Sequence, residues 1–248
     1  MQGDGAVVAD GVHRLTNGVS NFYLIEENGK LVLVDAGAPK DWSRLTRAVT
    51  ALGRSLADLD AVILTHAHSD HTGFAEQART AAGTRVWVHG SDSEMARTGQ
   101  VGARDGKATA YLLRPAFYKT LWVLTRAGST KIIPVKEVST FGDGETLDVP
   151  GRPRAVHAPG HTPGSAALFF ESRQVLLTGD TLVTHNPLTG RLGPQIMPAG
   201  LNTNSAQALR SLDNMAGITA DVLLAGHGEP WTGGMADAIS RAKAAGTS

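Results

Sequence analysis

Four side chains that can bind a metal ion fall within six residues of the sequence, in the order His66-Ala67-His68-Ser69-Asp70-His71. They come directly after the apolar run 61–64, which predicts a buried strand. If a tight turn follows that strand, His66 and His68 can face one metal ion while Asp70 and His71 face another. Imidazole and carboxylate ligands suit zinc, and also iron or manganese. With only nine histidines in 248 residues, such a cluster is improbable by chance.

Residues of the same kinds end four other apolar runs. Asp35 lies in Leu33-Val34-Asp35-Ala36-Gly37, and Asp180 lies in Leu177-Thr178-Gly179-Asp180-Thr181. His161 lies in Ala158-Pro159-Gly160-His161-Thr162-Pro163-Gly164, and His227 in Leu224-Ala225-Gly226-His227-Gly228-Glu229-Pro230. The neighbouring glycines and prolines let the backbone turn sharply at a strand end. The imidazoles of His161 and His227 can therefore point inward at a common cluster.

This series of motifs resembles the metallo-β-lactamase superfamily of metallohydrolases, over nearly the whole chain. The resemblance implies two divalent metal ions, zinc first with iron or manganese as alternatives. Each ion would have three ligands of its own: His66, His68 and His161 for one, and Asp70, His71 and His227 for the other. Asp180 would bridge the two ions together with a water or hydroxide, and Asp35 would orient a ligand without binding metal. The implied fold is α/β (α+β), a four-layer αβ/βα sandwich.

A bridging hydroxide between two metal ions would be a nucleophile next to a Lewis acid, because metal binding lowers the pKa of water from about 15.7 towards about 7. We therefore expect a hydrolase for a carboxylic ester, thioester or lactone, with Asp70 and Asp180 as catalytic residues. In the resembling family, true β-lactamases carry cysteine or serine at the position of Asp180, which disfavours lactam hydrolysis. The ligand set is more similar to glyoxalase II and the acyl-homoserine lactonases. The chain lacks the C-terminal helical region of the former, and has Val183 where the latter have tyrosine.

Other functions stay open at this point. One is an oxidoreductase with a single iron, similar to persulfide dioxygenases, although the complete second ligand set argues against it. Others are β-lactamase-like or phosphodiester hydrolysis, and metal binding without turnover. The sequence has no Gly-x-Ser-x-Gly motif for a serine hydrolase and no phosphate-binding glycine loop.

The composition of the chain limits the kinds of partner that the protein is expected to bind. The 23 basic and 23 acidic side chains give zero net charge, which is not typical of nucleic-acid binders. The absence of cysteine excludes disulfides, thiolate metal sites and cysteine nucleophiles. No apolar run reaches the roughly 18 residues of a membrane helix, and the first residues show no secretory signal. We expect a cytoplasmic protein that acts on a small molecule, without a nucleic-acid or membrane partner.

Short β-favouring runs alternate with helical runs in two comparable halves, which predicts sheets covered by helices. We expect strands over 21–26, 31–34, 61–64, 85–89, 146–149, 154–157, 165–170, 174–177 and 221–225. Helices are expected over 42–52 and 74–82, before Gly217, and from about residue 235. No linker is visible, so we expect one domain over 1–248 with a helical insertion around 91–134.

The insertion contains an aromatic-rich segment, 111–124, with Tyr111, Phe117, Tyr118 and Trp122. Because pockets for small molecules are lined mainly by apolar side chains, we expect Phe117, Tyr118 and Trp122 to wall or cover the site. A dimer contact, which would make the protein a homodimer, and a core helix are the alternatives. His185 and His89 are further candidates for substrate contact, whereas His13 and His157 are expected to be structural.

Overall fold

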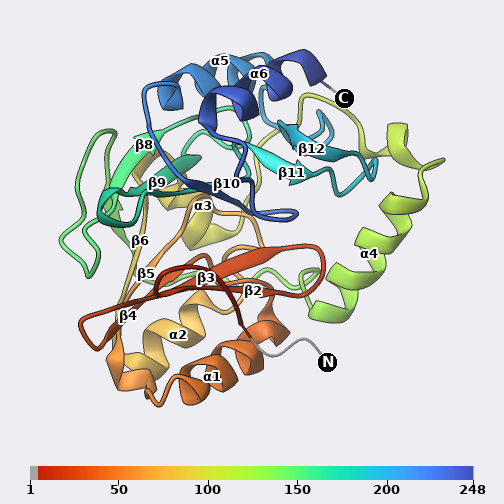
Figure 1. Ribbon diagram of the computed structural model, residues 1–248. Coiled ribbons are helices and arrows are strands. Elements are labelled where there is room, and N and C mark those ends of the chain that lie inside the picture. Colours follow the sequence, from red (N-terminus) through yellow and green to blue (C-terminus); the bar gives the residue numbers. More distant parts are fainter. Residues whose placement is uncertain (1–4, 248) are drawn as a thin grey trace.

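The structure is a computed structural model that describes residues 5–247. Residues 1–4, on which the expected absence of a signal peptide largely depends, lie outside the described part. Two sheets lie face to face, with helices on both outer sides (Figure 1). Within the described residues, no helix has the length and apolar character that crossing a membrane requires.

The first sheet has seven strands in sequence order, and its second half is parallel. The strands are β1 (Ala6–Ala9), β2 (Val12–Thr16), β3 (Asn21–Glu27), β4 (Lys30–Val34), β5 (Leu59–Ile63), β6 (Arg85–His89) and β7 (Ser139–Phe141). Parallel neighbours need a crossover connection, usually a helix. The crossovers contain α1 (Trp42–Ala51), α2 (Ala75–Ala82) and α3 (Ser93–Thr98), and buried residues of all three pack in the cluster on the outer side of this sheet.

The second sheet has four strands in the order β13, β10, β9, β8. They are β8 (Arg154–His157), β9 (Ala166–Phe170), β10 (Val175–Gly179) and β13 (Val222–Ala225), with β10 and β13 parallel. Its outer face is covered by α5 (Ser205–Ser211) and α6 (Met235–Ala245), seen at the top of Figure 1. A separate hairpin of β11 (Val183–His185) and β12 (Leu192–Gln195) packs beside α6.

Three apolar clusters form the core, one for each contact between layers. Leu45 of α1 lies between the first sheet and its helices. Ile63 of β5 and Leu177 of β10 meet between the two sheets. Leu176, the neighbour of Leu177, points to the opposite face and packs with Ala238 of α6, as successive residues of a strand do. The layers therefore run helix, sheet, sheet, helix, which confirms the predicted four-layer αβ/βα sandwich.

The aromatic-rich segment forms α4 (Pro115–Ala127), which lies at the edge of the molecule (Figure 1). Pro115 occupies the first turn, where its missing N–H leaves no intrahelical bond unmade. Thr120 is the only buried residue of this helix, and Leu113, two residues before the helix begins, is 96% exposed. The helix is therefore not part of the core.

Two expectations about secondary structure were wrong in detail. The run 146–149 is not a strand, because Thr146 makes only an isolated bridge to Arg154 and the chain turns at Pro150, which has no N–H to donate. The helix before Gly217 begins at Ser205 and continues as a 3-10 turn over Leu212–Met215. The strands β1, β7, β11 and β12 were not predicted.

Candidate metal centre

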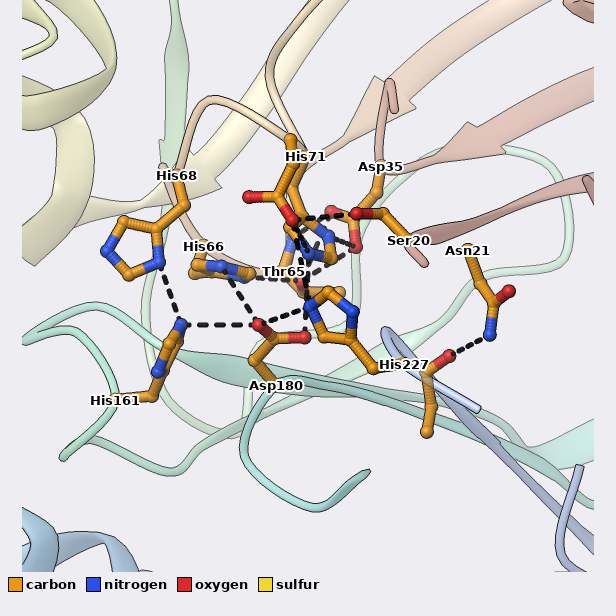
Figure 2. A network of polar contacts seen from close by, with 12 residues as sticks. Ser20, Asn21, Asp35, Thr65, His66, His68, His71, His161, Asp180 and His227 are labelled. Carbon is orange, nitrogen blue, oxygen red and sulfur yellow. Dashed lines mark hydrogen bonds and ion pairs between the residues drawn. The ribbon is translucent and has the colours of Figure 1, made fainter. Parts of the chain in front are cut away.

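The candidate ligands come together where strands of both sheets end. The loop with His66 follows β5, and Asp180 and His227 follow the parallel strands β10 and β13. His161 lies on the turn between β8 and β9. Because parallel strands end at the same edge of a sheet, these side chains converge between the two sheets (Figure 2).

The cluster contains three overlapping groups of three possible ligands, one of which, His66, His71 and Asp180, joins the other two. We call His66, His68 and His161 the first triad, and Asp70, His71 and His227 the second triad; in each, one possible ligand atom per residue lies within 4.8 Å of the others. In the first triad, His68 Nδ1 is 2.8 Å from His161 Nε2. In the second, Asp70 Oδ2 is 3.7 Å from the Nε2 atoms of both His71 and His227.

Asp180 lies between the triads. Its Oδ2 is 3.3 Å from His161 Nε2 and 3.1 Å from His227 Nε2. Its Oδ1 is 3.5 Å from His71 Nε2. Gly226 makes this approach possible, because a Cβ at that position would lie 2.1 Å from Asp180 Oδ1. The structure thus places all seven predicted ligands in one cluster, with Asp180 at its centre.

Buried atoms that make no hydrogen bond, and face other ligands only at 3.5–3.7 Å, indicate that the cluster fits metal ions. Among the described residues, His66 Nε2, His71 Nε2 and Asp180 Oδ1 are buried and make no hydrogen bond. A buried polar atom left without a partner costs about 1–3 kcal/mol. These atoms belong to imidazole and carboxylate groups, which are the usual ligands of divalent metal ions.

Burial and neighbouring charges divide the ligands into two electrostatic kinds. Burial holds the pKa values of His66 and His68 well below the ordinary value, and lowers the pKa of His161 to about 4. These rings are therefore neutral at pH 7 and have lone pairs free for a metal ion. Burial alone would also lower the pKa of His71, but the carboxylates of Asp180, Asp70 and Asp35 outweigh it and raise that pKa to about 10.

The carboxylate at the centre requires positive charge. Burial would raise the pKa of Asp180, but His227, His71 and His66 hold it well below the ordinary value. For His227, the carboxylates of Asp180 and Asp70 overcome burial and raise the pKa. Without metal, protonated His71 thus supplies positive charge that a metal cation would supply in its place, and the raised pKa of His227 favours the charged form of that ring as well.

Asp35 lies behind the second triad, as the resemblance implied. Its Oδ2 is 2.9 Å from His71 Nδ1, on the far side of the ring from the cluster. Its Oδ1 accepts a hydrogen bond of 2.8 Å from the Thr65 N–H. Asp35 has a positive φ of 61°, a conformation that aspartate tolerates better than most residues. It is placed to orient His71 and does not face the cluster.

Three other contacts that fix the ligands were not foreseen. His161 Nδ1 is 3.1 Å from Asn202 Oδ1, and His227 Nδ1 is 2.8 Å from the Val19 carbonyl oxygen. The Ser20 hydroxyl donates a hydrogen bond of 2.7 Å to Asp70 Oδ2. Serine and asparagine are so common in loops that the sequence contains no signal for these roles.

Asp92 was also missed, and it connects the two loops that carry the first triad. This fully buried carboxylate accepts hydrogen bonds from the Ala67 N–H at 3.0 Å, the Thr162 hydroxyl at 2.7 Å and the Gly164 N–H at 2.6 Å. Asp92 lies shortly after β6, much as Asp35 lies after β4. This position was the one feature of the sequence that could have indicated its role.

A cleft of about 310 Å³ opens onto the cluster. Its lining includes ligands of both triads and, from α4, Phe117, Thr120, Leu121 and Leu124. These positions share one face of the helix. Tyr118 and Trp122 lie on another face, are 54% and 62% exposed, and do not line the cleft. The helix is therefore a wall of the cleft, but of the three aromatic residues proposed for it only Phe117 takes part.

The two histidines proposed for substrate contact also lie away from the cleft lining. The ring of His89 stacks on His157, with centroids 4.0 Å apart, because β6 and β8 bring the two residues together. His185 lines a separate groove with Arg14, Trp231 and the residues that follow His227. Neither is placed to contact a substrate in the cleft.

Comparisons with known proteins agree with this geometry. Residues 15–227 match the family model of the metallo-beta-lactamase superfamily. The chain is 28% identical over 246 residues to the probable metallo-hydrolase YflN of Bacillus subtilis, covering 93% of this chain and 89% of that protein. It is 28% identical over 168 residues to the atrochrysone carboxyl ACP thioesterase dmxR1 of Cryptosporiopsis, covering 67% of this chain and 39% of that one. The crystal structure of the metallo-beta-lactamase family protein TTHA1429 of Thermus thermophilus has a TM-score of 0.69 at 25% identity, covering 96% of this chain and 80% of that one. The chain therefore belongs to the metallo-beta-lactamase superfamily and is a metal-dependent hydrolase.

Proposed function

We propose that the protein is a dinuclear hydrolase of carboxylic esters, thioesters or lactones. The observation that carries this proposal is the position of Asp180, whose Oδ2 lies 3.3 Å from a ligand of the first triad and 3.1 Å from a ligand of the second. Each triad would hold one divalent ion, with zinc as the first choice, and Asp180 would be shared. When bound, two such ions activate water and polarise the carbonyl oxygen of a substrate.

The chain's own residues hold this arrangement rigid. Asp35, Asn202 and the Val19 carbonyl each occupy the outer nitrogen of one ligand histidine, so that the other nitrogen faces the cluster. Among the side chains that form ion pairs in the cluster, that of Asp70 is the most exposed, at 15%, and it lines the cleft. We therefore assign the catalytic roles to Asp180 at the centre and to Asp70 on the side that a substrate can reach.

The cleft supports a small substrate with an apolar part. A volume of about 310 Å³ is at the lower end of pockets for small molecules. Phe117, Leu121 and Leu124 present apolar surface beside the cluster. One relative named above is a thioesterase, which supports the thioester among the three substrate classes. The complete second triad disfavours a single-iron oxidoreductase, because in such a site Asp70, His71 and His227 would bind no metal ion.

A panel of substrates tests the proposal. Metal-free protein is loaded with zinc, iron or manganese and assayed on an aryl ester, a thioester, a lactone, a β-lactam and a phosphodiester. We expect turnover of at least one of the first three, exceeding that of the last two, and its loss in Asp180→Ala. Turnover of the β-lactam or phosphodiester alone would contradict the proposed substrate class. Oxygen uptake with iron and no hydrolysis would contradict the proposed reaction.

A further inference from the structure

Arg104 is the one lysine or arginine among the described residues that line the cleft. It is half-buried, and its Nη1 donates a hydrogen bond to the Leu201 carbonyl oxygen. Within residues 5–247 it forms no ion pair with a carboxylate. A guanidinium has five N–H donors, so several remain for a ligand in the cleft.

The segment that carries Arg104 is fixed to the loop that supports the first triad. The Asp105 N–H donates to the Asn202 carbonyl at 2.8 Å, and the Gly106 N–H donates to the Ala199 carbonyl at 2.9 Å. The Asp105 carboxylate accepts a hydrogen bond of 2.9 Å from the Ser205 N–H. Arg104 is therefore held in place before any ligand binds, which reduces the entropy that binding would otherwise cost.

A cation without a counter-ion in a largely apolar cleft is costly. Burial lowers the pKa of Arg104, and the charge of Asp70 opposes that effect without an ion pair between the two side chains. The carboxylates of Asp70 and Asp180 already serve the two triads. The planar guanidinium fork matches the geometry of a carboxylate. An anionic group on a ligand is the partner that the site lacks.

We propose that Arg104 determines substrate specificity by binding a carboxylate that the substrate carries in addition to its hydrolysable ester, thioester or lactone group. The proposal rests on the proposed function and narrows its substrate class. The apolar wall of α4 would contact the body of the substrate, the cluster its reacting carbonyl, and Arg104 its second, anionic end. A substrate of this class is the monoester or monothioester of a dicarboxylic acid.

Two matched esters test the proposal with the metal-loaded protein. Phenyl hexanoate and monophenyl adipate have the same leaving group and chain length, and differ in a terminal methyl or carboxylate. We expect wild-type protein to prefer the adipate monoester in kcat/KM. In Arg104→Gln that preference should fall about 10- to 100-fold, mainly through KM, because charged hydrogen bonds are lost. Arg104→Lys should retain part of it.

Control variants separate recognition from a structural role. Arg210→Gln removes an exposed arginine of α5 and should leave the preference unchanged. If Arg104 only supports the Leu201 carbonyl, Arg104→Gln will slow both esters equally or lower the thermal midpoint without changing the preference. Either result would overturn the inference while leaving the proposed function standing.

Calorimetric binding of adipate to the metal-free protein provides a measurement that needs no turnover. Wild-type protein should bind adipate at least about tenfold more tightly than Arg104→Gln. If the loaded wild-type protein hydrolyses neither ester, the proposed function fails for this class, and the calorimetry alone decides the role of Arg104. Equal adipate affinities in the two proteins would overturn that role.

Discussion

Replacing Asp92 with alanine should loosen the metal centre although Asp92 does not face it. The change removes the acceptor for three donors: the Ala67 N–H, the Thr162 hydroxyl and the Gly164 N–H. The Thr162 hydroxyl can still bond to Ser165 Oγ, 2.8 Å away. Each of the two buried N–H groups left unpaired costs about 1–3 kcal/mol, so the free energy of unfolding should fall by about 2–6 kcal/mol. The loops that carry the first triad would also lose their mutual link, and metal affinity should fall about 10- to 100-fold.

Urea unfolding and competition with a chromophoric chelator measure these two effects. Asp92→Asn keeps one acceptor oxygen, so its free energy of unfolding and its metal affinity should both fall less than those of Asp92→Ala. Asp60→Ala, at an exposed position of β5, should change the free energy of unfolding by no more than about 0.5 kcal/mol. If Asp92→Ala loses less than about 1 kcal/mol and binds metal as tightly as the wild-type protein, the three hydrogen bonds do not have the importance we assign to them.

Three further predictions concern the site. Asp35→Asn should lower the metal affinity about 10- to 100-fold by misorienting His71, and unchanged affinity in the chelator assay would argue against that role. Phe117→Ala should raise KM for an apolar ester roughly 3- to 10-fold, since about 1 kcal/mol of apolar contact is lost. Trp122→Ala, on the exposed face of the same helix, should leave KM unchanged. Equal effects of the two substitutions on KM would contradict the assignment of this helix as a wall of the cleft. In the metal-free protein, the lowered pKa values of the first triad mean that the unfolded chain takes up protons below about pH 6.5 that the folded chain does not. The free energy of unfolding should therefore fall between pH 7 and pH 5, by up to about 1.4 kcal/mol per pH unit for each of these histidines. The second-triad histidines, whose pKa values are raised, contribute a constant amount to the free energy of unfolding below about pH 6.5. A urea midpoint that stays flat or rises towards pH 5 would contradict this prediction.

The ligands could be predicted from the sequence because each depends on a local pattern. An apolar run followed by histidine or aspartate, with glycine or proline nearby, marks a strand end that presents a ligand, and this pattern recurs at His66, His161, Asp180 and His227. The layered architecture was predictable for a similar reason. Alternating strands and helices leave few ways to bury their apolar faces.

The residues that support the ligands depend on contacts between distant parts of the chain. Asp92 and Thr162 are 70 residues apart, and no local pattern in the sequence shows that they meet. The strand β12 contains glycine and proline and lacks the β-favouring pattern. The orientation of α4 could not be derived either, because the stripe of apolar residues on it fits a cleft wall as well as a core.

The metal dependence of hydrolysis tests the central claim most directly. Metal-free protein is titrated with zinc, and bound metal and the rate of ester or thioester hydrolysis are measured in the same samples. If the two triads share Asp180 as the geometry indicates, the rate should rise until two equivalents are bound, and Asp180→Ala should lose the second equivalent together with activity. A full rate at one equivalent, unchanged by a second, would contradict the dinuclear site.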